Sequence, residues 1–305
     1  MLQVLLSGLA IGAIYGLVGM GFAIAFYVTR VINFAEGQLL MVGVMVAAWL
    51  ARTGLDPWLA VVVGIAAAAA VGAVTYLVAV RPVLAFDRFS FAWLVSTLGV
   101  ALILENGAAL IWGPTSRSFP ALLTGTSVHV GSATLTLQEV VTIGLAVVVA
   151  IAFELYRRKT LFGKLGMAIA HDPEMATALG ANTAVVAAAA FALAGAFAGL
   201  AGVLIGPITY SNPYLGDTYG IAGFVALMIG GTARPAAAMV GGLLLGILGE
   251  AANKLINTQA SDWFPFVVVV VILLVLPEGL FSLVGPLRRL VRRRSRRTSP
   301  VRVAG

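Results

Sequence analysis

Residues 30–51 read RVINFAEGQLLMVGVMVAAWLA, a stretch apolar enough to enter a lipid bilayer. Near its start it nevertheless carries the amides of Asn33 and Gln38 and the carboxyl group of Glu36, and Gly37 weakens any helix there. Polar groups persist at membrane depth only where they contact protein or a water-filled cavity. The stretch therefore predicts a broken membrane segment whose polar residues have a specific task.

Composition places the whole chain in a membrane. Of its 305 residues, 61% are hydrophobic and 10% are charged, with a mean hydropathy of +1.04. Soluble domains carry about 25% charged residues and have no room to bury so much apolar side chain. We therefore expect an all-α polytopic membrane protein.

Several kinds of site are excluded by residue usage. Cysteine is absent, and the only histidines, His129 and His171, lie far apart, so we expect no disulfide, no metal site and no bound cofactor. The net charge of +7 includes eight basic residues of the tail 285–305. We expect this tail to meet anionic lipid headgroups, and we expect no nucleic-acid partner.

Apolar runs of about 20 residues predict about 8–10 transmembrane helices, including short or broken spans. Residues 1–284 would form the transmembrane domain and residues 285–305 the tail. The first run is too long for a signal-peptide core, so we expect it to be retained. Clear spans are 4–28, 58–80, 91–112, 138–156, 184–206, 236–256 and 264–284, and two compromised spans are 32–51 and 220–233.

Basic residues orient these nine spans through the positive-inside rule. With the C-terminus inside and the N-terminus outside, sixteen of the nineteen lysines and arginines lie inside. They are Arg30, Arg81, Arg88, Arg157, Arg158, Lys159, Lys164, Arg234 and the eight of the tail. Only Arg52, Arg117 and Lys254 lie outside. This orientation predicts an external loop at 115–137 and a cytoplasmic loop at 157–183.

Glycines spaced by four residues predict close helix packing. They are Gly8/Gly12/Gly16, Gly195/Gly199, Gly202/Gly206 and Gly242/Gly246. Small residues at this interval let the backbones of membrane helices approach. Any single pair is ordinary in a polytopic protein, but together they favour a compact bundle.

The cytoplasmic loop contains a short helix with its own start and stop signals. Asp172 suits a helix cap, Pro173 suits the first helical position, and Glu174 favours the positive end of the helix dipole. The helix would run through EMATAL and end at Gly180, a natural left-handed cap. Such a short helix is marginal alone, so it either docks onto a partner or packs on its own domain.

The segment EMATALG resembles the E-A-A-x-x-x-G loop by which permease subunits of bacterial ABC importers contact their ATPases, with Met175 in place of the first alanine. The wider chain resembles the permeases of branched-chain amino-acid ABC importers (LivH-type). The resemblance is carried by VINFAEGQLLMVG, VRPVLAFDRFSFAWLVSTLGVALILENGAALIWGP, GKLGMAIAHDPEMATALGANTAVVAAAAFALAGAFAGLAGVLIGP, GGLLLGILGE and ILLVLPEGLF. The chain departs from the family at Arg234 and Pro235, after MIGG, and in having Glu36 and Gln38.

This resemblance implies a multi-pass protein of the bacterial cytoplasmic (inner) membrane. It implies a related permease subunit as heterodimer partner, two ABC ATPase subunits and an external substrate-binding protein. The ATPase-coupling residues would be Asp172, Pro173, Glu174, Ala176 and Gly180. ATP binding to the partners would then drive alternating access.

Two sets of polar residues are candidates for the substrate path. The first comprises Asn33, Glu36, Gly37, Gln38, Glu105 and Asn106, as lining or gate. The alternatives are an interfacial turn after Arg30 and, for Glu105, a structural hydrogen bond. The second comprises Tyr210, Asn212, Tyr214 and Asp217, at the outer mouth, either as a docking surface for a binding protein or as an ordered loop.

The chain has no GxxxxGK[ST] motif, so ATP would be used by partner subunits and this subunit would not be an enzyme. The leading function is inward transport of branched-chain amino acids. Urea, short amides or other amino acids are alternative cargoes. A second class is an ion-coupled carrier with Glu36 and Glu105 as ion sites. An intramembrane enzyme is disfavoured because no triad, metal set or carboxylate pair is visible.

Overall fold

A computed structural model describes residues 2–86, 91–119, 127–130, 133–232, 234–255 and 260–275. In this part of the chain, six helices are long and apolar enough to cross a membrane. Five of them are single helices: α1 (Leu2–Thr29), α5 (Ala92–Trp112), α6 (Leu137–Lys159), α9 (Thr183–Ile205) and α11 (Pro235–Leu255). The sixth is a continuous helical rod formed by α3 (Pro57–Thr75), the π-helical turn η1 (Tyr76–Val80) and α4 (Arg81–Phe86). The expected all-α polytopic class is confirmed.

Three further helices are apolar but shorter: α2 (Glu36–Arg52), α10 (Leu215–Gly230) and α12 (Ala260–Val275). Each of the nine expected spans thus has a helix among the described residues, with starts that differ by up to five residues, and residues 276–284 of the last span lie outside the described part. The span expected at 220–233 begins at Leu215, so Asp217 lies in its first turn instead of in a preceding loop. An acidic side chain is favourable at a helix N-terminus, which explains why the helix starts this early.

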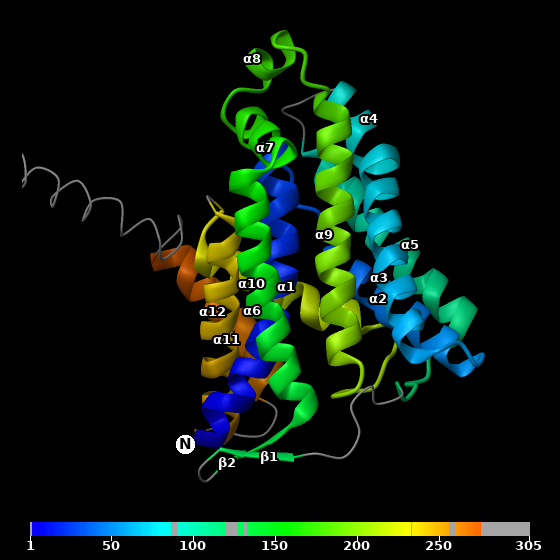
Figure 1. The fold of residues 1–305 in the computed structure, drawn as a ribbon, viewed down its shortest axis with the longest axis vertical. Coiled ribbons are helices and arrows are strands. Elements are labelled where there is room, and N and C mark those ends of the chain that lie inside the picture. The colour runs from blue at the N-terminus through cyan, green and yellow to red at the C-terminus, as the bar shows by residue number, and fades with distance from the viewer. Residues whose placement is uncertain are drawn as a thin grey trace, which may run out of the picture.

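The two ends of the bundle differ (Figure 1). One carries α7 (Leu161–His171) and α8 (Pro173–Ala178), and we name it the α8 end. The other carries the N-terminus and a hairpin of β1 (Ser127–Val130) and β2 (Ala133–Thr136), and we name it the hairpin end. Neither α7 nor the hairpin was expected. The tail 285–305 and Arg88 lie outside the described residues.

The hairpin end is fixed by local hydrogen bonds. Thr136 and Glu139 form a reciprocal capping box at the start of α6. Gln3 of α1 donates to the carbonyl of Thr134 at 3.0 Å and accepts from its backbone N–H at 2.9 Å. These contacts join α1, the hairpin and α6.

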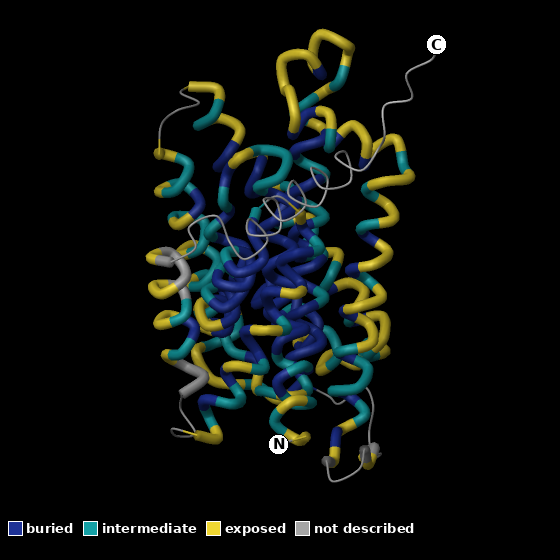
Figure 2. Tube along the Cα trace, turned by 90° about the vertical axis from the view of Figure 1, so that its left-hand side faces the viewer, coloured by how far each residue is buried: buried dark blue, intermediate teal, exposed yellow. Residues whose placement is uncertain are grey.

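The centre of the bundle is built on backbone contact between α1 and α11. The two helices run antiparallel, with Gly8, Gly12 and Gly16 facing Gly246, Gly242 and Met239. A Cβ placed on Gly12 would lie 2.8 Å from the Gly242 carbonyl oxygen, closer than real Cβ atoms approach. The expected close packing at these glycines is confirmed, and Figure 2 shows the resulting buried core.

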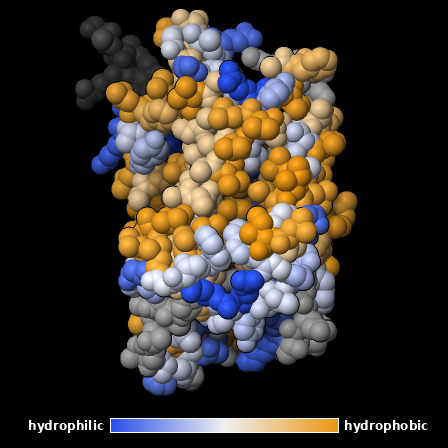
Figure 3. Space-filling view, turned by 90° about the vertical axis from the view of Figure 1, so that its right-hand side faces the viewer, coloured by the Kyte–Doolittle hydropathy of each residue, from blue (hydrophilic) through white to orange (hydrophobic). Residues whose placement is uncertain are grey.

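Outer helices surround this core and expose apolar side chains. In α5, for instance, Leu102, Ile103 and Leu110 are at least 61% exposed. A broad apolar surface covers much of the face seen in Figure 3, and a hydrophilic patch interrupts it in its lower half. An apolar outer surface is what lipid contact requires.

Candidate functional site

The first part of the candidate site is the break between α1 and α2. Helix α1 stops at Arg30, whose φ of 60° is left-handed and whose guanidinium donates to the Ala170 carbonyl of α7 at 2.9 Å. The chain then turns at Asn33, whose side-chain oxygen accepts from the Ala35 N–H at 3.2 Å. The Asn33 amide donates to the Glu36 carboxyl group at 3.2 Å. Asn33 therefore shapes the turn and partners the carboxyl group.

This break lies deep in the bundle. Asn33 and Glu36 have no exposed surface. The Glu36 carboxyl group fills the space where a Cβ of Gly21 would be, and that Cβ would also lie 3.1 Å from the Ala194 carbonyl oxygen of α9. Gly21 precedes the end of α1 by eight residues, about 12 Å along the axis. This depth favours the bundle interior over a headgroup-level turn.

Helix α2 begins at this depth and meets the start of α10. The Gly37 backbone packs directly on the Gly216 carbonyl and on Gly220, where a Cβ on Gly37 would lie 2.7 Å from the Gly220 Cα. A side chain at Gly37 would separate the two helices. The glycine that appeared to loosen a helix therefore serves a close backbone approach.

The second part of the candidate site is a polar cluster formed by α2, α5 and α10. The Gln38 side-chain nitrogen donates to Asp217 Oδ1 at 2.8 Å and to Glu105 Oε2 at 3.3 Å. Gln38 is only 2% exposed, Glu105 is half-buried and Asp217 is exposed. One neutral amide therefore bridges two carboxyl groups, and the cluster opens outward between the helices.

The structure places the remaining candidate residues in different surroundings. Asn106 does not join Glu105 in the cluster: it is exposed and donates to the Leu102 carbonyl of its own helix at 2.8 Å. Tyr210 and Tyr214 are exposed before α10, and the Asn212 side chain accepts from the Tyr214 N–H at 2.9 Å. Asp217, assigned from sequence to this outer group, belongs with Gln38. Contacts between distant segments decided this, and no local pattern signalled it.

Helix α8 has the expected local signals. The Asp172 side chain accepts from the Met175 N–H at 2.9 Å, Pro173 occupies the first position, and Glu174 lies in the first turn. Gly180 has a φ of 90°, so it ends this segment in a left-handed conformation. The predicted start, course and stop of this helix are confirmed.

One side of α8 faces its own domain. Ala176 is only 5% exposed and packs with Ile169 of α7 and Val186 of α9. Met175 is 59% exposed and Leu179 is 81% exposed. The helix therefore docks through Ala176 and presents Met175, and Leu179 at its C-cap, outward. Figure 1 shows α8 projecting beyond the bundle.

The family described as branched-chain amino acid transport system / permease component matches residues 4–276. The chain belongs to this permease family. The resemblance seen in its residue blocks is thereby confirmed, and the chain is a multi-pass membrane permease component.

Named relatives of this permease match over most of their length. The high-affinity branched-chain amino acid transport system permease protein LivH of Escherichia coli (strain K12) is 33% identical over 296 residues, covering 92% of this chain and 95% of the relative. The corresponding BraD protein of Pseudomonas aeruginosa is 29% identical with the same coverage. A probable branched-chain amino acid transport permease protein LivH of Methanocaldococcus jannaschii is 26% identical and covers 87% of each chain. No solved structure matches the chain.

Two hollows lie at the α8 end of the permease. A groove of about 1040 Å³ runs beside α8, with Arg81 and Phe86 of α4 on one wall and Glu174 and Thr177 on the other. It is the larger hollow and is open to the surface beside the projecting helix. Helix α8 contributes Pro173, Glu174, Thr177 and Ala178 to its lining.

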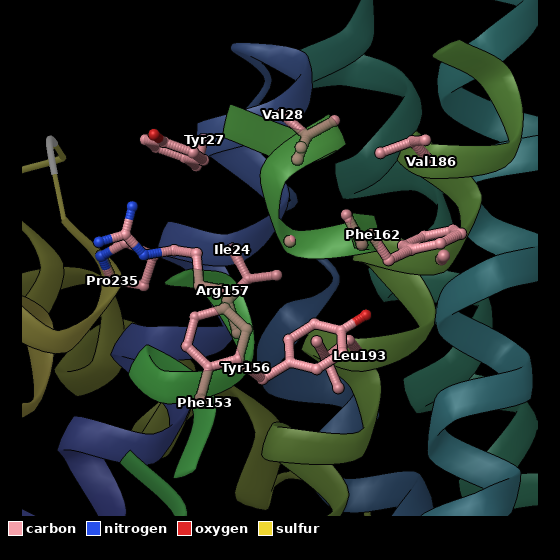
Figure 4. Close-up of a pocket in the computed structure, with 14 residues that line it drawn as sticks. Ile24, Tyr27, Val28, Phe153, Tyr156, Arg157, Phe162, Val186, Leu193 and Pro235 are labelled. Carbon is pink, nitrogen blue, oxygen red and sulfur yellow. The ribbon is translucent and has the colours of Figure 1, made fainter. Parts of the chain in front are cut away.

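The other hollow is a small cleft between α1, α6, α7 and α9 (Figure 4). Aromatic side chains, including Phe153, Tyr156 and Phe162, line it, and the Arg157 guanidinium stacks on the Tyr27 ring at 5.7 Å. Its volume of about 60 Å³ is far smaller than that of the groove beside α8. Helix α7 contributes Phe162, Gly163 and Gly166 to its lining.

Proposed function

We propose that this permease is the translocation-pathway subunit of an ATP-driven importer in the bacterial cytoplasmic membrane. Separate ATPase subunits would bind the α8 end, and a related permease subunit would complete the pathway as a heterodimer. An external binding protein would deliver branched-chain amino acids at the hairpin end. ATP is used by the partners, and this chain binds no cofactor of its own.

The observation that carries the proposal is the construction of α8. A helix of six residues is too short to persist without support. Here it is capped at both ends, is docked by Ala176, and holds two large apolar side chains in the open. Exposed Met175 and Leu179 beside a large groove suit a protein partner that pushes on this helix. Motion of α8 would reach α1 through α7, because Arg30 joins α1 to the Ala170 carbonyl.

The polar break supports a pathway through the bundle. Transporters commonly form substrate sites where membrane helices are interrupted near mid-membrane. Here α2 and α10 both begin inside the bundle, and their first turns meet at Gly37 and Gly216. Alternating access would open this meeting point first to one side and then to the other.

Cysteine crosslinking tests the ATPase contact. The chain has no natural cysteine, so Leu179→Cys places one reactive thiol on the exposed surface of α8. In membranes of the native host, we expect a crosslinked adduct in which mass spectrometry identifies a P-loop ATPase. Ser127→Cys, exposed at the hairpin end, is the matched control and should give no such adduct. Ala176→Cys is unsuitable as the main probe because that position is buried.

The opposite result would contradict the proposal. A Leu179→Cys thiol that reacts with a small maleimide and yet captures no ATPase would leave α8 as a connector within its own domain. That result would favour the second candidate function, an ion-coupled carrier using Glu36 and Glu105, because such a carrier requires no ATPase partner.

A further inference from the structure

The cluster of Gln38, Glu105 and Asp217 has an unbalanced charge. Both carboxyl groups contact the same amide nitrogen, at 2.8 Å and 3.3 Å, so they lie close to each other. Neither forms an ion pair among the described residues, where the only two salt bridges join Glu154 to Arg157 and to Arg158. Two neighbouring carboxylates without a cation are unfavourable, and more so at membrane depth.

The cluster also has an unused acceptor inside the protein. The Gln38 side-chain oxygen is buried and has no hydrogen-bond partner in the described part of the chain. It lies against the backbone of Gly216, next to Asp217, where any larger residue would overlap it. Burying an amide oxygen without a partner is unfavourable, because the oxygen loses its hydrogen bonds to water and gains none. Three side chains thus present acceptor oxygens at one place, and one of these oxygens lacks a donor.

The missing component is a cationic donor of hydrogen bonds. A primary ammonium group carries one positive charge and three donors, and it has no acceptor. The described residues contain no group of three or more histidine and acidic side chains that could hold a metal ion. Asp217 is exposed and Glu105 half-buried, so a ligand can reach both carboxyl groups.

We propose that Gln38, Glu105 and Asp217 form the site that receives the α-ammonium group of an amino acid during its passage. This inference rests on the function proposed above and names the recognition element within that pathway. Branched-chain amino acids have apolar side chains, so their ammonium and carboxylate groups are their only strong polar features. The single positive charge of the ammonium group would offset one of the two carboxylate charges as the cargo passes, and each carboxylate would accept one of its hydrogen bonds.

Neutral, nearly isosteric variants test the site: Glu105→Gln, Asp217→Asn and the double variant. Each keeps the shape of the side chain and removes repulsion, so the protein should still fold. Glu139→Gln is the matched control, because it neutralises a carboxylate at the hairpin end while glutamine still completes the capping box. Size-exclusion profiles and ligand-free melting temperatures establish that the variants are intact.

The first measurement is ligand stabilisation of the purified permease complex without binding protein or ATP. L-leucine should raise the melting temperature of the wild type and of Glu139→Gln but not of the double variant, because a ligand stabilises only a state that binds it. The 2-hydroxy analogue, 2-hydroxy-4-methylpentanoate, has no ammonium group and should not stabilise any of them. Equal stabilisation by the 2-hydroxy analogue or by sodium ions, or persistence of the leucine effect in the double variant, would overturn the proposal.

The second measurement is leucine uptake per ATP hydrolysed in proteoliposomes containing the full complex and its binding protein. Each single variant should lose about tenfold, the effect of one charge-assisted hydrogen bond, while ATP hydrolysis continues. Wild-type uptake with unchanged coupling in all three variants would overturn the ammonium site and leave the proposed function standing. Failure of the wild type itself to take up any amino acid would contradict the proposed function, and leucine stabilisation would then decide the site alone.

Discussion

The central helices α1 and α11 and the rim helices α5 and α6 use glycine in opposite ways. Where α1 meets α11, Gly16 and Gly242 touch through their backbones, and a Cβ on Gly242 would overlap Gly16. On the rim, Gly99 and Gly107 of α5 and Gly144 of α6 have no described atom beyond their own helix backbone within 4 Å of where a Cβ would be. Close packing therefore requires glycine at these central positions, whereas the chain leaves space for a side chain at the rim positions.

This difference follows how far each helix is buried within the chain itself. In the most apolar window, 83% of the α1 residues are buried but only 11% of those of α5. The centre encloses the broken start of α2 and the buried Glu36 completely. The rim helices expose apolar side chains that lipid or a partner subunit would cover. The Gln38–Glu105–Asp217 cluster lies where α5 of the rim meets the first turns of α2 and α10.

Adding one methyl group should separate the two regions most strongly. Gly242→Ala places a Cβ into the backbone of Gly16, and we expect a loss of about 3 kcal/mol or more in stability, because overpacked backbone cannot repack locally. Gly144→Ala on the rim should change stability by less than about 0.5 kcal/mol. Thermal unfolding in detergent measures both, and equal melting temperatures would contradict the packing account.

Asparagine provides the next contrast. Asn33→Ala removes the donor to Glu36 and the acceptor for the Ala35 N–H, both buried, so we expect a loss of about 1–3 kcal/mol. Asn106→Ala on α5 removes only an exposed bond to its own helix and should cost less than about 0.5 kcal/mol. Unfolding in a mild detergent with increasing SDS would measure the stability lost in each variant. A larger loss for Asn106→Ala would show that the rim is covered by a partner.

The smallest expected stability effect concerns two helix caps at opposite ends of the molecule. Asp172→Ala removes the cap of α8 and Asp56→Ala removes the cap of α3, and each should cost about 1 kcal/mol. Only Asp172→Ala should lower ATP-driven uptake, because α8 is the proposed contact of the ATPase. Uptake that falls equally in both variants would indicate a general stability effect instead of coupling.

Local signals were enough to predict the spans and α8. Apolar length located each membrane helix, and Asp172, Pro173 and Gly180 defined the short helix because caps and left-handed stops depend on neighbouring residues alone. The same reasoning could have found α7, since Thr160 caps it by accepting from the Gly163 N–H at 3.1 Å. Signals of this kind need no knowledge of the fold.

Tertiary contacts were beyond such reasoning. Asp217 meets Gln38 across 179 positions of chain, and the depth of Glu36 depends on Gly21 of a different helix. Ala176 was taken from sequence as a coupling contact, but the structure shows it packed inward, because the side that a six-residue helix buries is set by its neighbours. Sequence predicted which residues were polar in the membrane, and the fold determined which of them meet.

The most direct test of ATP-driven transport is uptake by the purified complex in proteoliposomes with imposed gradients. Radiolabelled leucine would be followed with the binding protein outside, with or without ATP inside, and with proton and sodium gradients abolished by ionophores. The account predicts uptake that requires ATP and persists without either gradient. Uptake that continues without ATP and stops when the gradients collapse would contradict it and identify an ion-coupled carrier.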